Sequence, residues 1–564
     1  MCGIFGCISK KPQNLIDSTL QGLKILEYRG YDSAGIAYQQ TNPNNSTLKV
    51  IKSVGEINHL SKKIKDRPAT NICIGHTRWA TNGEVNETNS HPHLSFDQEI
   101  AVVHNGIIEN YQACYQHLKT HNIKLKTPVD TEVIPNMLYL LQHNKHNIHN
   151  ILQGQYVFCA IENNKNNLFL AKKGNLPLFI GRNQNTIYIT SDTLALPPNV
   201  NEIITLDSLD TCEISNSQIN FFHNSKPITK DWQQFNQSFC ASDKHGFTTY
   251  MEKEINEIPF VIENIFRHYQ TDQKLTKLKQ EFTDLIKDSQ CVHICGCGTS
   301  YHAAKIIATI FEREFKIRSI AHISSELTSD MLLKEKATSI VISQSGETAD
   351  TLNCMDILNQ HNIPIIALCN VTTSTIAKRS QITFPLLCGP EIAVASTKVF
   401  CAAVLVGCLL AKDYSQNYQK KFIQLSKEIL KNARQILPLP QTQPSKIFVI
   451  GKGISYSLAL ETALKIKEVT YLHCEGYPAN ELKHGPLSMV DNQTLAIAFG
   501  DNTENATAEI QARGGHVIHI PNNNHPLAFI SQIILAQIFA LDMALSLGIN
   551  PDKPRNLAKS VTVL

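Results

Sequence analysis

The residue with the clearest chemical potential is a cysteine at the second position, in the opening Met-Cys-Gly. Methionine removal is favoured before small residues and would leave Cys2 with a free α-amine. That amine titrates at about pH 7.7, so it can take the proton of its own thiol at neutral pH without a separate catalytic histidine. Because a cysteine can also stand second by chance, its role depends on the residues that accompany it.

Several polar groups in the first half have the types that bind an amino acid. Arg78, in the run HTRWAT (76–81), is expected where a strand passes into a loop, and its guanidinium offers a fork for an α-carboxylate. After a second strand, the Asn105 side-chain amide and the Gly106 backbone N–H are two donors for an oxyanion. Asp130 has the charge to receive an α-ammonium group. Together with a thiol, these groups describe a site for an amino acid that carries a scissile amide.

A hydroxyl-rich turn in the second half, SQSGET (343–348), stands between an apolar strand and a helical pattern that begins near Ala349. Such a turn at a helix N-terminus combines free N–H groups with the positive end of the helix dipole, which suits a phosphate monoester. The same residues also make an ordinary capping turn. A second turn of this kind, Gly298-Thr-Ser300, favours phosphate. Neither is a nucleotide motif, because no Gly-Lys-Ser/Thr follows and the third glycine of a dinucleotide fingerprint is missing.

Three later residues have the chemistry that a ketose requires. Glu468 stands on a predicted helix, His484 in a loop just before a Gly-Pro break, and Lys559 close to the end of the sequence. A positioned carboxylate can move a proton next to a carbonyl, and an amine with a lowered pKa can form an imine. Taken singly, each of these residues is more often a solvated surface charge, so their setting has to decide.

The first ~215 residues, which must position the cysteine, are rich in short strands bounded by Gly, Asn or Asp. Two helical patterns, at 14–27 and 131–142, interrupt strands expected at 72–75, 100–103, 156–161, 168–171 and 186–190. This mixture predicts an α+β sandwich. Residues 216–245 are polar and weakly periodic, and are expected to be a linker.

The second half alternates buried-type strands with long helical patterns, which predicts parallel sheets covered by helices. The strands are expected at 292–295, 339–343, 364–369, 447–451, 495–499 and 516–520. HICGCGTSYHAA (293–304) and FVIGKGISYSLA (448–459) superpose at an offset of 155 residues, so this half is read as two copies of one α/β domain. Only the first copy has the hydroxyl-rich turn, because the second has AFGDNT (498–503) in its place. One sugar-phosphate site per chain is expected.

Length and composition limit the alternatives. A chain of 564 residues exceeds a single hydrophobic core, and about 100–200 residues per domain predicts three or four domains. A net charge of +3 gives no reason to expect a nucleic-acid or membrane partner. No secretory signal or membrane-length apolar run is present, and the sixteen cysteines are scattered as in reduced proteins, so a cytoplasmic location is expected. The spacings of Cys295/Cys297 and His91/His93 do not suit a metal, and neither a metal nor an organic cofactor is expected.

Four motifs together resemble the N-terminal-nucleophile glutaminase domain of class II amidotransferases: CGI (2–4), EYRGYDSAG (27–35), HTRWAT (76–81) and HNGIIEN (104–110). The resemblance implies that Cys2 is the nucleophile and that Asn105 and Gly106 form the oxyanion hole. It assigns glutamine binding to Arg78, Asp130 and Thr81, and makes Trp79 a gating indole near the path of ammonia.

Further motifs resemble sugar-isomerase domains as they occur in the glutamine–fructose-6-phosphate aminotransferase (isomerising) family: residues 343–351, 391–398, 481–486 and 556–562. The resemblance implies that phosphate binds Ser300, Ser343, Gln344, Ser345 and Thr348, with Lys465 near the sugar. It implies that His484, from the neighbouring subunit of a homodimer, assists ring opening. Lys559 would form a Schiff base at C2, and Glu468 would move the proton between C1 and C2.

The expected domain order is a glutaminase domain (2–215), a linker with a helical lead-in (216–284), two sugar-isomerase domains (285–425 and 440–550) and a tail (551–564). The implied substrates are L-glutamine and D-fructose 6-phosphate. Two alternatives remain open: another class II amidotransferase, although no pyrophosphate-sugar or ATP-pyrophosphatase loop is found, and a module that senses a sugar phosphate without catalysis. A module that only binds would have no reason to keep Glu468, His484 and Lys559 together.

Overall fold

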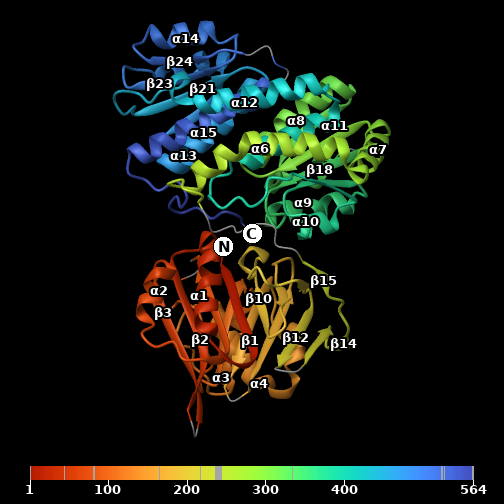
Figure 1. The fold of residues 1–564 in the computed structure, drawn as a ribbon, viewed down its shortest axis with the longest axis vertical. Helices are drawn as coiled ribbons and strands as arrows, with labels where there is room; N and C mark the ends of the chain where they lie inside the picture. Colours follow the sequence, from red (N-terminus) through yellow and green to blue (C-terminus); the bar gives the residue numbers. More distant parts are fainter. Residues whose placement is uncertain are drawn as a thin grey trace. The chain divides into compact units, whose positions relative to one another are not determined.

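The structure is a computed structural model that describes residues 2–42, 45–79, 83–163, 165–215, 218–235, 244–332, 335–522, 525 and 527–561. The chain divides into two compact units, shown in Figure 1. Unit 1 comprises Met1–Asp243 together with Ala558–Leu564, and unit 2 comprises Lys244–Leu557.

Unit 1 contains two antiparallel sheets. The first has eight strands in the order β15-β11-β9-β10-β1-β4-β2-β3, with bounds β1 Gly3–Gln13, β2 Ser33–Asn42, β3 Asn45–Val54, β4 Thr70–Arg78, β9 Phe179–Arg182, β10 Thr186–Thr190, β11 Glu202–Thr205 and β15 Gln233–Gln234. The second has seven in the order β14-β13-β12-β8-β7-β6-β5, with bounds β5 His93–Leu94, β6 Ile100–Gly106, β7 Tyr156–Glu162, β8 Asn167–Lys173, β12 Asp210–Ser215, β13 Ile219–His223 and β14 Lys226–Ile228.

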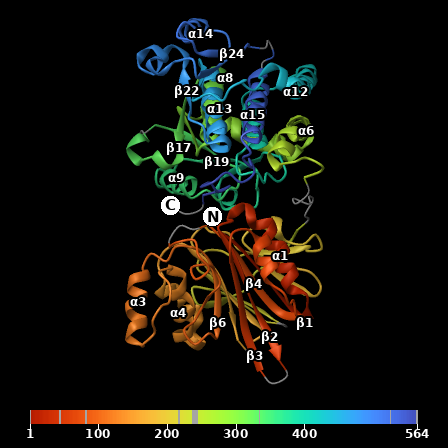
Figure 2. The ribbon, with the colours of Figure 1, turned by 90° about the vertical axis from the view of Figure 1, so that its left-hand side faces the viewer.

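The two sheets face each other because their strands alternate in hydrophobic side chains. In β1, Ile4 and Ile8 belong to the core between the sheets, whereas Phe5 and Cys7 point to the outer face. The outer faces are covered by helices with bounds α1 Leu15–Leu26, α2 Ile57–Lys63, α3 Tyr111–Thr120, α4 Val133–Leu141 and α5 Ile148–Ile151. Figure 2 shows α1 on one side of unit 1 and α3 and α4 on the other. The predicted α+β sandwich is confirmed.

The prediction of a linker was wrong for part of residues 216–245. Within residues 216–245, three short strands (β13, β14 and β15) complete the edges of both sheets. Of the five residues of β13 only Phe221 is buried, so the strand carries almost no hydrophobic alternation to reveal it.

Unit 2 contains two parallel sheets, confirming the other part of the predicted fold. Their orders are β17-β16-β18-β19-β20 and β22-β21-β23-β24, with bounds β16 Cys291–Gly296, β17 Arg318–Ile323, β18 Ala337–Ser343, β19 Ile365–Cys369, β20 Ile382–Pro385, β21 Lys446–Gly451, β22 Cys474–Pro478, β23 Thr494–Phe499 and β24 His516–Ile520. In each copy the strand of the repeated motif leads into a helix through a glycine with positive φ, Gly298 at 51° and Gly453 at 60°.

The helices of unit 2 cover its two sheets, and most of them share one hydrophobic core with both sheets. Their bounds are α6 Tyr250–Thr271, α7 Gln273–Lys287, α8 Thr299–Phe315, α9 Ala349–Gln360, α10 Thr375–Arg379, α11 Lys398–Ala411, α12 Gln416–Ile436, α13 Ile454–Thr470, α14 Glu504–Gln511 and α15 Ala528–Ser546. Helix α8 of the first copy packs on α13 of the second, and α13 packs on α15 (Figure 2). Among the described helices, only α15 is long and apolar enough to cross a membrane, and 83% of that stretch is buried in the core of unit 2.

Candidate active sites

Cys2 lies where β1, β4 and β6 meet at one end of the sandwich. The backbone N–H of Trp79, just after β4, donates to its Sγ at 3.3 Å. The side-chain amide of Asn105, on β6, donates to its carbonyl oxygen at 3.1 Å. Strands β4 and β6 extend further than the sequence suggested and carry Arg78, Asn105 and Gly106 within them. These residues are therefore fixed by sheet hydrogen bonds on both sides of the thiol.

Two glycines near Cys2, Gly3 and Gly106, occupy positions that leave no room for a side chain. A Cβ on Gly3 would lie 2.7 Å from Thr77 Oγ1 and 2.8 Å from Leu26 Cβ, so a side chain there would push the Cys2 backbone away from β4. Gly106 has a φ of +118°, and a Cβ there would lie 2.2 Å from a backbone oxygen. The conformation that turns the Gly106 N–H suits glycine alone.

The electrostatic setting of Cys2 keeps its thiol protonated at neutral pH. Burial raises the pKa of the Cys2 thiol, and the positive charge of the chain terminus, the Trp79 N–H and the Arg78 guanidinium oppose that effect only in part. A thiol with a raised pKa needs a base to become a nucleophile. The free α-amine expected after methionine removal would be such a base.

The groups predicted to hold an amino acid surround this thiol. Arg78 is 3% exposed, and burial lowers its pKa, whereas the nearby carboxylates of Asp32 and Asp130 act in the opposite direction. Asp130 accepts the Ile108 N–H at 2.8 Å, which fixes the direction of its carboxylate. The structure thus brings Cys2, Arg78, Asn105 and Asp130 into one neighbourhood. Thr81 lies outside the described residues.

His76 is a further functional candidate. From the sequence it was named only as part of the HTRWAT motif, without a role. Its Nε2 lies 2.9 Å from the carbonyl oxygen of His104 and 3.1 Å from Oδ1 of Asn105, so it donates to these acceptors. Burial lowers the pKa of His76 to about 3, which leaves the ring neutral. By holding Oδ1, His76 turns the amide nitrogen of Asn105 towards Cys2. The alternation of side chains along β4 could have indicated this role. His76 and Arg78 continue the row of Ile72 and Ile74, which faces the core between the sheets.

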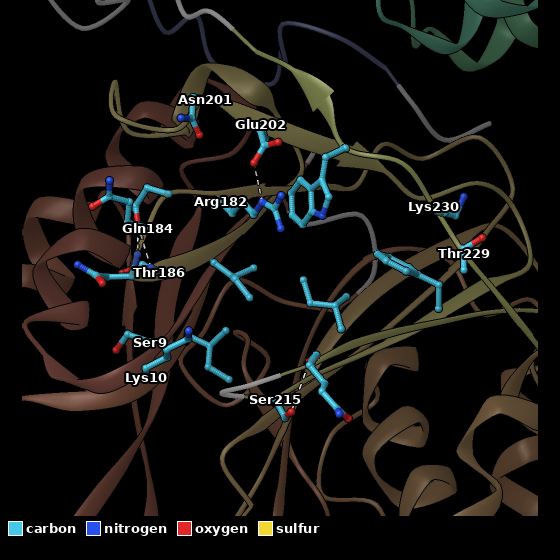
Figure 3. A pocket seen from close by; sticks show the side chains of 18 of the residues that line it. Ser9, Lys10, Arg182, Gln184, Thr186, Asn201, Glu202, Ser215, Thr229 and Lys230 are labelled. Carbon is cyan, nitrogen blue, oxygen red and sulfur yellow. Dashed lines mark hydrogen bonds and ion pairs between the residues drawn. The ribbon is translucent and has the colours of Figure 1, made fainter.

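A cavity of about 650 Å³ in unit 1 has no part in this site. Figure 3 shows it between Ser9 and Lys10 of β1 and the Arg182 side chain, which lies 3.9 Å over the ring of Trp232. Ser9 is about 20 Å along an extended strand from Cys2. Of the predicted glutamine-binding residues that the structure describes, which are Arg78, Trp79 and Asp130, none lines this cavity.

The predicted phosphate site of unit 2 lies at the carboxyl ends of two neighbouring parallel strands, β16 and β18. Ser343 Oγ accepts the Gly346 N–H at 2.9 Å and lies 3.3 Å from Thr348 Oγ1, and Ser345 Oγ accepts the Glu347 N–H at 3.2 Å. These bonds curl the turn so that helix α9 begins at Ala349. Neither Thr348 nor Gly298 caps its helix with a side chain, so two adjacent helix N-termini offer N–H groups to an anion.

A buried charge cluster on α13 lies beside the first of these helices. Lys465 is 1% exposed, and its Nζ lies 2.5 Å from Glu468 Oε2 and 3.6 Å from Glu461 Oε1. Burial alone would lower the pKa of Lys465, but the carboxylates of Glu468, Glu461 and Glu391 raise it above the ordinary value. Lys465 is therefore a permanent cation and unsuited to form an imine.

Glu461 was missed by the sequence reading. Its side chain is completely buried and accepts hydrogen bonds from Thr299 Oγ1 at 3.0 Å and His302 Nδ1 at 2.7 Å. Both donors lie in the first turn of α8, next to Ser300. The spacing of four residues between Glu461 and Lys465 could have indicated that these two side chains interact on one helix. Nothing in the sequence indicated that Glu461 contacts α8.

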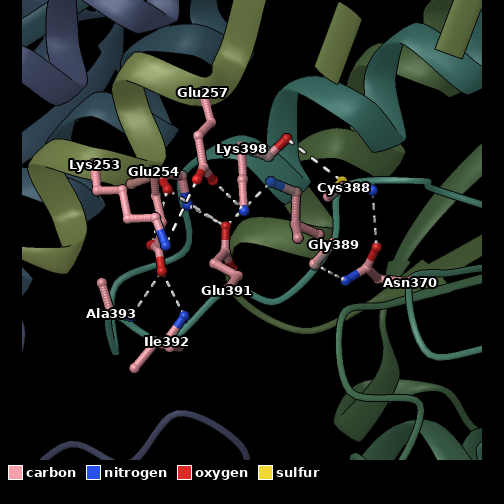
Figure 4. Close-up of polar contacts among 12 residues, drawn as sticks. Lys253, Glu254, Glu257, Asn370, Cys388, Gly389, Glu391, Ile392, Ala393 and Lys398 are labelled. Carbon is pink, nitrogen blue, oxygen red and sulfur yellow. Dashed lines mark hydrogen bonds and ion pairs between the residues drawn. The ribbon is translucent and has the colours of Figure 1, made fainter. Parts of the chain in front are cut away.

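A loop between β20 and α11 is held by buried carboxylates (Figure 4). Glu254, on α6, accepts the N–H groups of Ile392 and Ala393, the latter at 3.1 Å. Glu391 accepts the N–H groups of Thr397 at 2.9 Å and Val399 at 3.1 Å, and so caps α11. The negative charge of Glu391 also raises the pKa of Lys465.

Comparison with known proteins identifies both units. A model of a glutamine amidotransferase domain matches residues 76–198, and a model of the SIS domain matches residues 285–412 and 442–527. The chain is similar over its whole length to glutamine–fructose-6-phosphate aminotransferases (isomerizing) of Campylobacter jejuni, at 33% identity over 612 residues, and Clostridium perfringens, at 32% over 623 residues. All of each protein is covered. The chain belongs to the glutamine–fructose-6-phosphate aminotransferase family.

Two solved structures are similar to part of the chain. The C-terminal domain of glucosamine-fructose-6-phosphate aminotransferase from Francisella tularensis is 27% identical, with a TM-score of 0.47, over 56% of this chain and 100% of that one. Glucosamine-6-phosphate deaminase from Thermotoga maritima is 25% identical, with a TM-score of 0.49, over 56% of this chain and 98% of that one.

Two further residues were predicted for the sugar site. His484 is exposed at the end of a short 3-10 helix, Ala479–His484, and no hydrogen bond or ion pair within the described chain joins it to Lys465 or Glu468. Lys559 is half-buried and belongs to residues 558–564, which group with unit 1. The catalytic roles of His484 and Lys559 stay predictions.

No group of three or more His, Cys, Asp or Glu residues in the described parts of the chain is arranged to hold a metal ion. That metal and organic cofactors are not needed also stays a prediction.

Proposed function

We propose that the chain converts D-fructose 6-phosphate and L-glutamine into D-glucosamine 6-phosphate and L-glutamate. The observation that carries the proposal is the full-length similarity to aminotransferases of that name. The reaction would be the first step towards UDP-N-acetylglucosamine.

Glutamine would bind with its α-carboxylate on Arg78 and its α-ammonium on Asp130, which would place its carboxamide carbon at Cys2. The thiol proton passes to the free α-amine, and Sγ attacks the carboxamide carbon. The Asn105 amide and the Gly106 N–H stabilise the negative oxygen of the tetrahedral intermediate. The amine returns its proton to the departing nitrogen, which leaves as ammonia, and water hydrolyses the thioester to glutamate. Trp79 and Thr81 complete the pocket in this proposal.

Fructose 6-phosphate would bind through its phosphate at the N-termini of α8 and α9. The proposed ligands are Ser300, Ser343, Gln344, Ser345 and Thr348. The two helix dipoles and the uncapped N–H groups favour a dianion at this place. The bound phosphate would present the sugar carbons to α13.

The sugar chemistry is proposed for three residues. His484 assists ring opening, and Lys559 condenses with the C2 ketone to an imine and releases water. Ammonia then displaces Lys559 at C2. Glu468 takes a proton from C1 and returns one to C2, which converts the ketose imine into the aldose amine. Lys465, held as a cation, keeps Glu468 in place.

We also propose a homodimer, in which the exposed His484 serves the neighbouring subunit, and a cytoplasmic location. The proposed domain order is glutaminase, linker, two sugar-isomerase domains at 285–425 and 440–550, and the tail that carries Lys559.

A product assay tests the proposal. The purified protein, with Met1 removed, is incubated with glutamine and fructose 6-phosphate, and glucosamine 6-phosphate and glutamate are measured. Equal amounts of both are expected. Release of glutamate without amino sugar would contradict the proposal and favour a glutaminase with a sugar-phosphate sensor.

A further inference from the structure

One buried contact joins the two copies of the repeat beside the proposed sugar site. His302, in the first turn of α8, donates from Nδ1 to Glu461 Oε2 of α13 at 2.7 Å. Thr299 donates to the other oxygen of the same carboxylate at 3.0 Å. The Glu461 side chain is completely buried and that of His302 is 13% exposed. Both carboxylate oxygens are thus engaged on the α8 side.

The position of Lys465 reflects this engagement. Its ammonium group lies between two carboxylates but is much closer to Glu468, at 2.5 Å, than to Glu461, at 3.6 Å. A fully buried carboxylate draws in any cation within reach unless other donors satisfy it. His302 and Thr299 supply those donors, so Lys465 remains with Glu468.

We propose that His302 is a positioning residue for the sugar chemistry. By holding Glu461 towards α8, it leaves the Lys465 ammonium to fix Glu468, the carboxylate that moves the proton between C1 and C2. The inference rests on the proposed function. Without His302, the Glu461 carboxylate keeps one neutral donor, and Lys465 moves towards it. Glu468 then loses the partner that sets its direction.

The repeat supports a role beyond packing. At the offset of 155 residues, His302 corresponds to Ser457 and Glu461 corresponds to Ile306. The His–Glu pair therefore occurs once in the duplicated architecture, as the hydroxyl-rich phosphate turn does. The pair also lies close in sequence to a proposed phosphate ligand, because His302 stands two residues after Ser300.

The test compares two substitutions in the full-length protein. His302→Ser introduces the residue of the other copy and removes the bond to Glu461 without adding bulk. His302→Asn keeps an N–H donor near the position of Nδ1. We expect His302→Ser to lower kcat for glucosamine 6-phosphate about ten- to a hundredfold, with the KM for fructose 6-phosphate changed by less than about threefold. His302→Asn should restore most of kcat. His361→Ser, at an exposed histidine after α9, is the matched control.

A double substitution separates positioning from a merely structural role. Glu461→Gln removes the charge that competes for Lys465, so adding His302→Ser to it should change kcat little further. Equal kcat values for His302→Ser and His361→Ser, or no rescue by His302→Asn, would overturn the inference. Those outcomes require a wild-type protein that forms product. A wild type that forms no glucosamine 6-phosphate would instead refute the proposed function, and this inference with it.

Discussion

Replacement of Asn105 tests the proposed oxyanion hole. Both polar atoms of the Asn105 side chain have a partner in the structure. Its Oδ1 is held by His76 Nε2 at 3.1 Å, and its Nδ2 points to the carbonyl oxygen of Cys2 at 3.1 Å. Asn105→Ala removes the donor, whereas His76 keeps its bond to the carbonyl oxygen of His104 at 2.9 Å. The site should therefore stay assembled while it loses one donor.

The expected magnitude follows from this geometry. Loss of one preorganised donor to an oxyanion costs about a hundred- to a thousandfold in kcat, which corresponds to roughly 2.7–4 kcal/mol. Because the Gly106 N–H remains, activity should fall to this level and not vanish. The KM for glutamine should change little, since the carboxylate and ammonium contacts of Arg78 and Asp130 are untouched.

The assay is glutamate release from glutamine by purified protein. Asn110→Ala is the control, because it removes two hydrogen bonds of unit 1 that lie at the start of α3, to Ile151 and Gln153. It should leave kcat within about twofold. If Asn105→Ala kept kcat within about threefold of the wild type, the oxyanion assignment would be wrong.

Three further predictions concern other groups. Cys2→Ala should abolish glutamate release with little change in melting temperature, and persistent release would exclude the nucleophile. Lys559→Arg should stop glucosamine 6-phosphate formation while glutamine is still hydrolysed, and undiminished synthesis would exclude the Schiff base. His76 has its pKa lowered to about 3 in the folded state against about 6.5 unfolded, so its stabilising contribution is complete above pH 6.5 and is lost as pH falls towards 3. His76→Gln should flatten that part of the dependence of unfolding free energy on pH, and an unchanged slope would refute the assignment.

Much of the architecture could be predicted because it rests on local patterns. The start of α9 at Ala349 followed from an apolar strand and a hydroxyl-rich turn, and the strand expected at 100–103 is part of β6. Strands β13 to β15 were missed because they close the edges of the sheets and bury few side chains. Their sequence is as polar as a linker.

The candidate sites were predictable in type and only partly in arrangement. Cys2 and Asn105 could be predicted because they stand in motifs, and Lys465 could be predicted from the family resemblance. The part played by His76 depends on a contact between two strands, and that of Glu461 on a contact between two copies of a repeat. Such contacts between distant segments leave no trace in spacing, so His302 and Glu461 emerged only from the fold.

The central claim is that the nitrogen released at Cys2 becomes the amino group of the sugar. The most direct measurement uses glutamine labelled with heavy nitrogen in its side-chain amide, together with fructose 6-phosphate and an excess of unlabelled ammonium. Mass spectrometry then determines the label in the product. We expect glucosamine 6-phosphate that carries the label on its C2 nitrogen. An unlabelled amino sugar, or labelled ammonium without any amino sugar, would contradict it.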